Sequence, residues 1–161
     1  MIFHASSISP GRSRALEQCA NSRPSEIEDC TLPWTLPSSS FDYIHLRWLV
    51  GSIPDWNALF AEAYAACRPG GWVESIEPSC IVESDHVKMP ETAALSQWGR
   101  MCVEAGKKMG RTFTVVGEGL QRKGMEAAGF TDIQEFDYKV SPRLSKQNAS
   151  LKLANITRPH P

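Results

Sequence analysis

Several features that mark other protein classes are missing from this sequence. No stretch approaches the roughly 20 apolar residues of a membrane-spanning helix, and the apolar run at the start is too short for a signal-peptide core. The balance of 17 Lys and Arg against 18 Asp and Glu gives a net charge of −1. Such a balance lacks the basic footprint of a nucleic-acid-binding domain. We therefore expect neither a membrane nor a nucleic acid as partner.

Paired cysteines are missing as well. The five cysteines are odd in number and scattered, without a C-x-x-C pair, and the four histidines are scattered too. This pattern favours reduced thiols in an intracellular protein over a disulfide framework or a zinc site. We predict no metal site and a cytoplasmic location, with the nucleus as the alternative.

The stretch 41–77 contains the strongest structural pattern. Residues 41–46 have the composition of a buried strand. A helix is predicted from Pro54, with Ser52 as a candidate cap, and its apolar residues recur at three- and four-residue spacing. Pro69-Gly70-Gly71 is expected to end that helix before a second strand at 72–77. Two strands joined by a helix lie parallel in one sheet, so the fold class is α/β.

The rest of the chain supports a single domain flanked by two weakly patterned ends. We predict a poorly ordered arm at 1–24, a domain at 25–140 and a basic, poorly ordered tail at 141–161. Within the domain, helices are expected at 90–110 and from Gly119 to Ala128, and a strand at 133–140. The first helix has one apolar face, which indicates a core contact or, alternatively, the wall of a small-molecule pocket; its residues are Trp98, Met101, Cys102, Ala105 and Met109.

Four motifs in this order resemble the class I S-adenosylmethionine-dependent methyltransferases. The amino-acid sequence of these motifs is most similar to that of the fungal methyltransferases of secondary metabolism, including their global-regulator branch. The motifs are EDCTLPW at 28–34, SFDYIH at 40–45, RPGGWVE at 68–74 and AAGF at 127–130. The resemblance covers roughly 27–140 and implies a Rossmann-like parallel sheet with flanking helices.

The resemblance also implies a site at the carboxyl ends of the strands, where open α/β sheets bind ligands. Glu28 or Asp29 would accept a hydrogen bond from the adenine amino group of S-adenosylmethionine. His45, Leu46 and Arg47 would border the methyl group and the amino-acid portion of the cofactor. Glu77 would face the substrate, and Trp98 lies in the region where such enzymes place substrate-covering helices.

Methyl transfer from a sulfonium requires a positioned acceptor and removal of its proton. His45 is the candidate base, because histidine titrates near neutral pH. The alternative is a structural histidine that caps a strand end through a backbone hydrogen bond. Arg47 would pair with the cofactor carboxylate or, equally, with a surface acid.

One part of the family pattern is missing, so the fold is expected to be incomplete, with its first strands absent. Nothing before Glu26 supplies the glycine-rich loop, and Gly117-Glu118-Gly119 lies on the wrong side of the first strand. Loss of the ribose-binding carboxylate alone would weaken cofactor binding by roughly ten- to a hundredfold. The missing strand would also leave 41–46 as an apolar, uncharged edge, open to a partner protein or to self-association.

The sequence thus predicts a methyltransferase acting on a small-molecule or protein acceptor, with cofactor binding weak or absent. The alternatives are a non-catalytic interaction module derived from such an enzyme and a truncated, inactive fragment.

Overall fold

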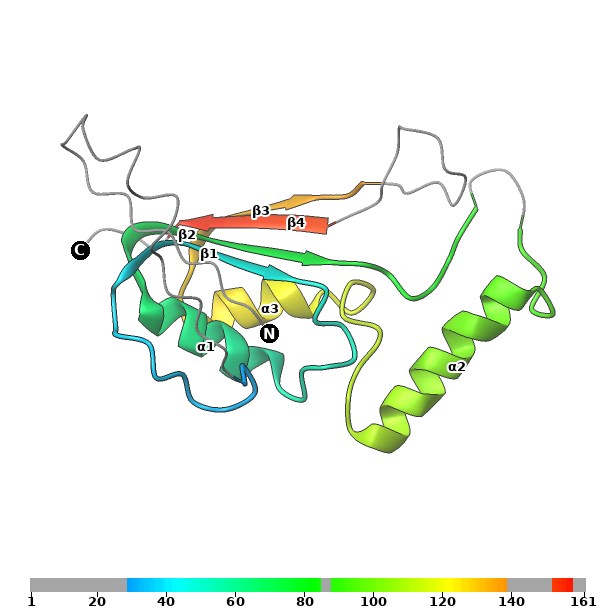
Figure 1. Cartoon of the computed structure of the whole chain (residues 1–161). Helices are drawn as coiled ribbons and strands as arrows, with labels where there is room; N and C mark the ends of the chain where they lie inside the picture. The colour runs from blue at the N-terminus through cyan, green and yellow to red at the C-terminus, as the bar shows by residue number, and fades with distance from the viewer. Residues whose placement is uncertain (1–28, 85–87, 139–151, 158–161) are drawn as a thin grey trace, which may run out of the picture.

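The computed structural model describes residues 29–84 and 88–138 and the backbone of 152–157. Its elements alternate in the order expected of an α/β domain (Figure 1). In chain order they are β1 (Phe41–Arg47), α1 (Trp56–Ala66), β2 (Cys67–Glu77), α2 (Ala94–Met109), α3 (Leu120–Ala128), β3 (Thr131–Phe136) and β4 (Lys152–Thr157).

The predicted strand, helix and strand at 41–77 are confirmed. β1 and β2 are parallel, with Tyr43 opposite Trp72. The helix begins two residues later than Pro54, because Asp55 and not Ser52 is its N-cap: the Asp55 carboxylate accepts hydrogen bonds from the N–H groups of the next turn. β2 already begins at Cys67, so the Pro-Gly-Gly turn lies inside the strand, where the register with β1 shifts.

The sheet is mixed, with strand order β1-β2-β4-β3. β4 is antiparallel to both of its neighbours, β2 and β3. It lies within the segment 141–161, and the poor order of that segment stays a prediction. The arm at 1–24 lies outside the described residues, and the domain boundaries at 25 and 140 stay a prediction.

One face of the sheet is covered by α1 and α3, which pack against each other (Figure 1). The core lies between these helices and the sheet, because alternate residues of each strand point to one side. Ile44 and Leu46 of β1 and Val73 of β2 are buried there, and Phe60 of α1 is completely buried. The helices α1 and α3 are flanking helices of the kind that the family resemblance predicts.

The predicted edge position of β1 agrees with the structure, since β1 is the outermost strand of the described sheet. The edge is not uncharged, however. Asp42 forms an ion pair with Arg68 of β2, with 2.7 Å between Oδ1 and Nη1.

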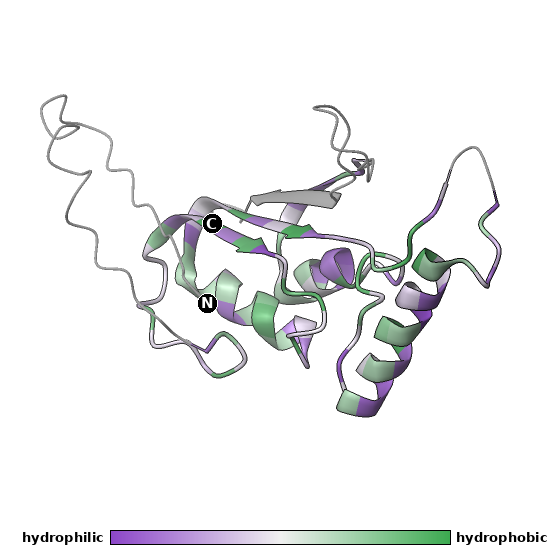
Figure 2. Cartoon of the chain, turned by 45° about the vertical axis from the view of Figure 1, so that its right-hand side comes forward, coloured by the Kyte–Doolittle hydropathy of each residue, from purple (hydrophilic) through white to green (hydrophobic). Residues whose placement is uncertain are grey.

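α2 projects from the rest of the chain (Figure 2). Its packed side is formed by glycines. A Cβ on Gly99 would lie 3.0 Å from the carbonyl oxygen of Cys80, and one on Gly106 would lie 2.6 Å from the Phe113 ring. The larger apolar residues, in contrast, are more than half exposed: Trp98, Met101 and Met109. The core interpretation of this face is therefore wrong, and the pocket-wall alternative stays open.

Candidate functional site

The carboxyl ends of β1 and β2 lie side by side and point toward α2 (Figures 1 and 2). β1 ends at Arg47, whose side chain is exposed, and β2 ends at Glu77. This edge is where parallel sheets of this type bind ligands. The predicted residues at the two strand ends are thus brought together.

Glu77 lies inside the protein, with 1% of its surface exposed. Both carboxylate oxygens accept a hydrogen bond from the N–H of Leu49 at 2.9 Å, and Oε2 accepts a second from Val50 at 2.8 Å. Burial raises the pKa of Glu77 to about 7, although these N–H groups favour the charged form. In this arrangement Glu77 fixes the loop after β1, and its predicted contact with substrate would require that loop to move.

His45 belongs to a polar cluster on the sheet face opposite α1 and α3. Its Nδ1 lies 2.6 Å from Oε2 of Glu74 on β2, and the Tyr43 hydroxyl donates to the same oxygen. Burial, with Glu74 beside it, raises the pKa of the Tyr43 hydroxyl. The histidine partner is therefore a carboxylate side chain and not the backbone carbonyl of the structural alternative. This arrangement leaves Nε2 as the nitrogen that would receive a proton.

The other predicted cofactor residues differ in what they can offer. Leu46 has 1% exposure in the core, so only its backbone can border a ligand. Asp29 is exposed, and its Oδ1 accepts from the N–H and the hydroxyl of Thr31 at 3.0 and 2.7 Å. The hydrogen bond from the Thr31 N–H, and after it the bond from the Thr31 hydroxyl, lower the pKa of Asp29. The positive charge of Arg111 lowers it further. Glu28 lies outside the described residues.

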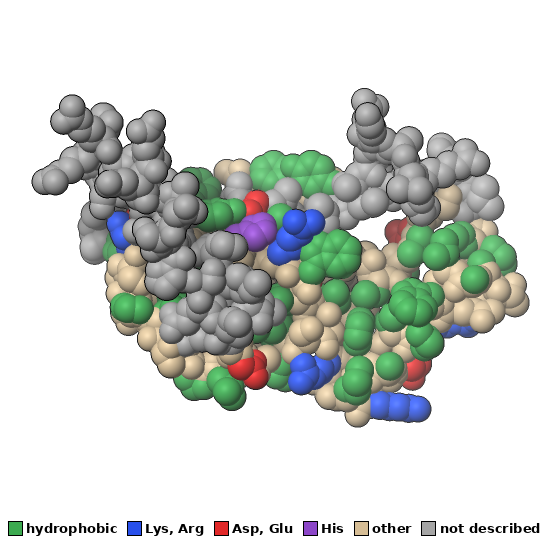
Figure 3. All heavy atoms as spheres, viewed as in Figure 1, with side chains coloured by type: hydrophobic (Ala, Val, Ile, Leu, Met, Phe, Trp, Pro, Cys, Tyr) green, Lys and Arg blue, Asp and Glu red, His purple; other side chains and the backbone are tan. Residues whose placement is uncertain are grey.

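A cavity of about 400 Å³ lies beside α2, a volume in the range of small-molecule sites. Its lining combines the segment after β2, α2 and Thr114. Arg100 on this lining forms an ion pair with Glu91, with 3.2 Å between the charged atoms. Trp98 lies outside the cavity, on the exposed apolar face of α2, and Figure 3 shows hydrophobic side chains gathered on the surface over this helix.

Neither a metal cluster nor a membrane span accompanies this site. No group of three or more His, Cys, Asp or Glu in the described part of the chain is arranged to hold a metal ion. Within the same residues, no helix has the length and apolar character needed to cross a bilayer.

Sequence reasoning missed Glu74 and Trp48. The parallel register of the two predicted strands could have identified Glu74, which lies directly opposite His45. Trp48 follows the end of β1 and has the left-handed backbone conformation, with φ of 57°. Nothing in the local sequence indicates that conformation, because bulky residues rarely adopt it.

Comparison with known proteins identifies the family. A methyltransferase-domain family matches residues 5–135, which is most of the chain. The chain belongs to this methyltransferase family. Similar proteins include the secondary metabolism regulator LAE1 of Cochliobolus heterostrophus, 36% identical over 66% of this chain and 34% of that protein. The probable methyltransferase tdiE of Emericella nidulans is 36% identical over 70% of this chain and 34% of its own length.

Solved structures support the fold of the methyltransferase domain. An S-adenosylmethionine-dependent methyltransferase from Methanosarcina mazei matches 83% of this chain and 66% of its own, with a TM-score of 0.55 at 13% identity. A second, from Thermotoga maritima, has a TM-score of 0.50 at 17% identity and covers 78% and 59% of the two chains. The predicted class I fold is therefore confirmed. The chain spans about a third of the length of the fungal relatives named above.

Proposed function

We propose that this chain forms the carboxyl-side part of an S-adenosylmethionine-dependent methyltransferase site, with a small-molecule or protein acceptor. The observation that supports it most is the meeting of the carboxyl ends of β1 and β2 at one edge, opposite the apolar face of α2. Cofactor and acceptor would meet at this edge. The family uses this cofactor, whereas its binding to this chain is part of the proposal.

The residues present fit parts of the cofactor. The exposed guanidinium of Arg47 would pair with the cofactor carboxylate, and the Asp29 carboxylate would accept from the adenine amino group. Glu28 beside it remains a candidate for the same bond. S-adenosylmethionine supplies an electrophilic methyl group, and the acceptor loses one proton when its oxygen, nitrogen or carbon atom takes that group.

His45 would take this proton at Nε2. Glu74 holds the opposite nitrogen, Nδ1, at 2.6 Å, which fixes the ring and stabilises the imidazolium that forms. The imidazole has 34% side-chain exposure on the sheet face opposite α1 and α3, so the acceptor must reach it from that side. The Trp98 face of α2 and the cavity beside α2 would bind the rest of the acceptor.

Calorimetric titration with S-adenosylmethionine tests this function. We expect binding that is weakened about tenfold by Asp29→Ala, because a hydrogen bond to a charged group contributes about 1.5–3 kcal/mol. His45→Ala should weaken binding as well. Glu126→Ala removes an exposed carboxylate of α3 and should leave binding unchanged. No heat from the unmodified chain at millimolar cofactor would refute cofactor binding.

A non-catalytic interaction module is the second candidate, favoured by the outermost position of β1. An unpaired strand edge is a template for pairing with a further strand. If copies of the chain associate through this edge, the unfolding midpoint in differential scanning calorimetry should rise with protein concentration. A midpoint that stays constant over a hundredfold concentration range would exclude self-association as the reason for this edge.

A further inference from the structure

Trp48 combines two features that rarely occur together. Its backbone is left-handed, with φ of 57°, and its side chain is 58% exposed. A bulky residue in this conformation costs free energy, and such residues persist only where the surrounding structure fixes them. Burial of the indole does not offset the cost here, because more than half of the side chain faces solvent.

The loop that carries Trp48 is fastened to the end of β2. The Trp48 N–H donates to the carbonyl oxygen of Ile76 at 3.0 Å. The next two N–H groups donate to the buried Glu77 carboxylate. Burial of a carboxylate in the core costs free energy unless it is hydrogen-bonded. The three hydrogen bonds to Glu77 therefore indicate that the conformation of this loop is fixed by the core.

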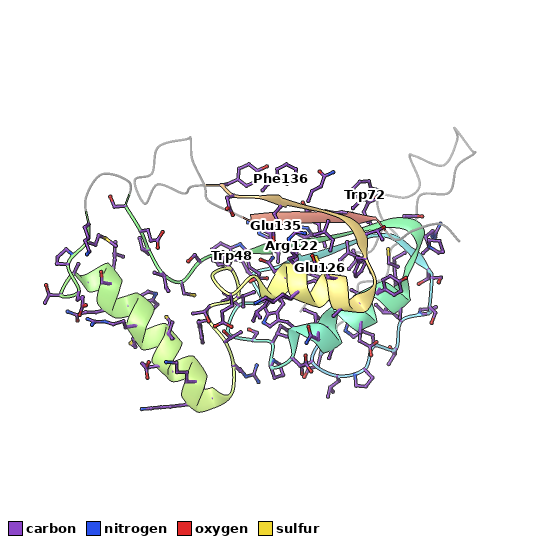
Figure 4. All side chains as sticks on the ribbon, turned by 180° about the vertical axis from the view of Figure 1, so that it is seen from behind. Trp48, Trp72, Arg122, Glu126, Glu135 and Phe136 are labelled. Atoms are coloured by element: carbon purple, nitrogen blue, oxygen red, sulfur yellow. The ribbon has the colours of Figure 1, made fainter. Side chains whose placement is uncertain are left out.

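The same loop is fastened on its other side to the segment after α2. The Gly51 N–H donates to the carbonyl oxygen of Thr112 at 3.1 Å, and the guanidinium of Arg111 donates to the carbonyl oxygen of Ser52. Leu49 and Ile53 are anchored in the core, each with 1% exposure. Trp48 is therefore an exposed indole on a rigid base, at the end of the sheet that faces α2 (Figure 4).

We propose that Trp48 is a ligand-binding residue on which the flat ring of an aromatic methyl acceptor stacks, and that Glu77 is the positioning residue for it. The choice of the acceptor rests on the proposed function. There, Arg47 and Asp29 take the charged portion and the adenine of the cofactor, and Trp48 comes immediately after Arg47. An indole offers a large apolar surface to planar rings, and Trp48 lies at the end of the sheet that is nearer to α2.

The test uses the full chain labelled with ¹⁵N-tryptophan, in which the indole N–H signal of Trp48 is assigned with Trp48→Phe. The probe is 2-naphthol, and its saturated analogue decahydro-2-naphthol controls for apolar contact alone. We expect 2-naphthol to shift the Trp48 signal and to bind about tenfold more weakly to Trp48→Ala. The matched control Trp72→Ala removes an indole exposed to 42% elsewhere on the sheet and should leave affinity unchanged.

The outcomes separate this proposal from the proposed function. If 2-naphthol shifts the indole N–H signal of Trp48 while S-adenosylmethionine does not bind, the stacking role of Trp48 is supported and the cofactor assignment fails. The stacking role of Trp48 is refuted if Trp48→Ala binds 2-naphthol as tightly as the unmodified chain does. It is also refuted if decahydro-2-naphthol binds the unmodified chain as tightly as 2-naphthol does. The same holds if adenosine and not 2-naphthol shifts the signal, because the ring bound by Trp48 would then belong to the cofactor.

Two further variants distinguish a binding role from a structural one. Asparagine tolerates the left-handed conformation, so Trp48→Asn should lose the tenfold affinity while its unfolding midpoint stays equal or rises. A structural indole would give a lower midpoint instead. At pH 8, Glu77→Gln offers one acceptor oxygen in place of two, and should broaden the Trp48 signal and weaken 2-naphthol binding severalfold. An unchanged signal and affinity in Glu77→Gln would refute the positioning role.

Discussion

Phe60→Ala is expected to lower the free energy of unfolding by about 3–5 kcal/mol, the usual cost of removing a large aromatic side chain from a core. Phe60 is completely buried at the contact between α1 and α3. It fits tightly there, because a Cβ on Gly124 of α3 would lie 2.6 Å from its ring. The total free energy of unfolding of a native domain is about 5–15 kcal/mol, so the variant should be close to unfolding.

Urea denaturation followed by circular dichroism at 25 °C measures this loss. Phe136→Ala is the matched control, since Phe136 of β3 is 41% exposed on the other side of the sheet and should cost far less (Figure 4). Equal losses in the two variants would show that the contact between α1 and α3 is not the centre of the core.

The elements that the sequence predicts well are those whose signals are local. The β1, α1 and β2 unit has a strand of buried residues, a proline just before the helix and apolar residues at helical spacing within it, although its cap is Asp55 and not the predicted Ser52. α3 ends as predicted, with Gly129 in the left-handed conformation at φ of 97°. Such signals depend on neighbours within a few residues, and no distant contact is needed to interpret them.

The errors arise where distant contacts decide the structure. The apolar stripe of α2 predicts a core contact or a pocket wall, whereas the helix packs through the glycines at 99 and 106, which let it approach Cys80 and Phe113. A pattern of large side chains cannot reveal a contact made by backbone. β4 has no clear alternation and forms by pairing with two strands far away in the sequence.

The candidate site shows the same division. The sequence places His45, Arg47 and Glu77 at strand ends, and the structure brings the two strands together. The inward direction of Glu77 could still be inferred, because residues two apart on a strand share a face. Val73 and Ser75, which share the face of Glu77, are buried. The loop conformation at Trp48, in contrast, depends on Glu77 and on the segment after α2, and no nearby residue predicts it.

The stability of the chain is expected to fall as pH rises through the titration of Glu77. The pKa of this carboxyl is 4.5 when exposed and about 7 in the folded chain, because burial disfavours its charge. The folded state therefore binds the proton more tightly than the unfolded state. This contribution to stability is complete below pH 4.5 and is lost by about pH 7, and its size is about 3 kcal/mol.

Glu77→Gln removes this dependence, since the amide carries no charge at any pH. At pH 4.5 the protonated acid and the amide each offer one carbonyl oxygen, so the two proteins should be about equally stable. At pH 8 the variant should exceed the unmodified chain by up to about 3 kcal/mol. Urea titrations of both proteins at several pH values measure the difference, in which all other ionisable groups cancel.

A difference that stays constant between pH 4.5 and 8 would contradict the raised pKa. A difference in unfolding free energy that follows the predicted pH curve would connect stability with the conformation of the loop. The ionised Glu77 carboxylate destabilises the fold, yet only this form offers two charged oxygens to the N–H groups of Leu49 and Val50. The rigid position of Trp48 would then depend on a charge that the core holds at a cost. Glu77→Gln should accordingly be the more stable protein at pH 8 and the weaker binder of a flat ring, whereas a purely structural carboxylate would change stability alone.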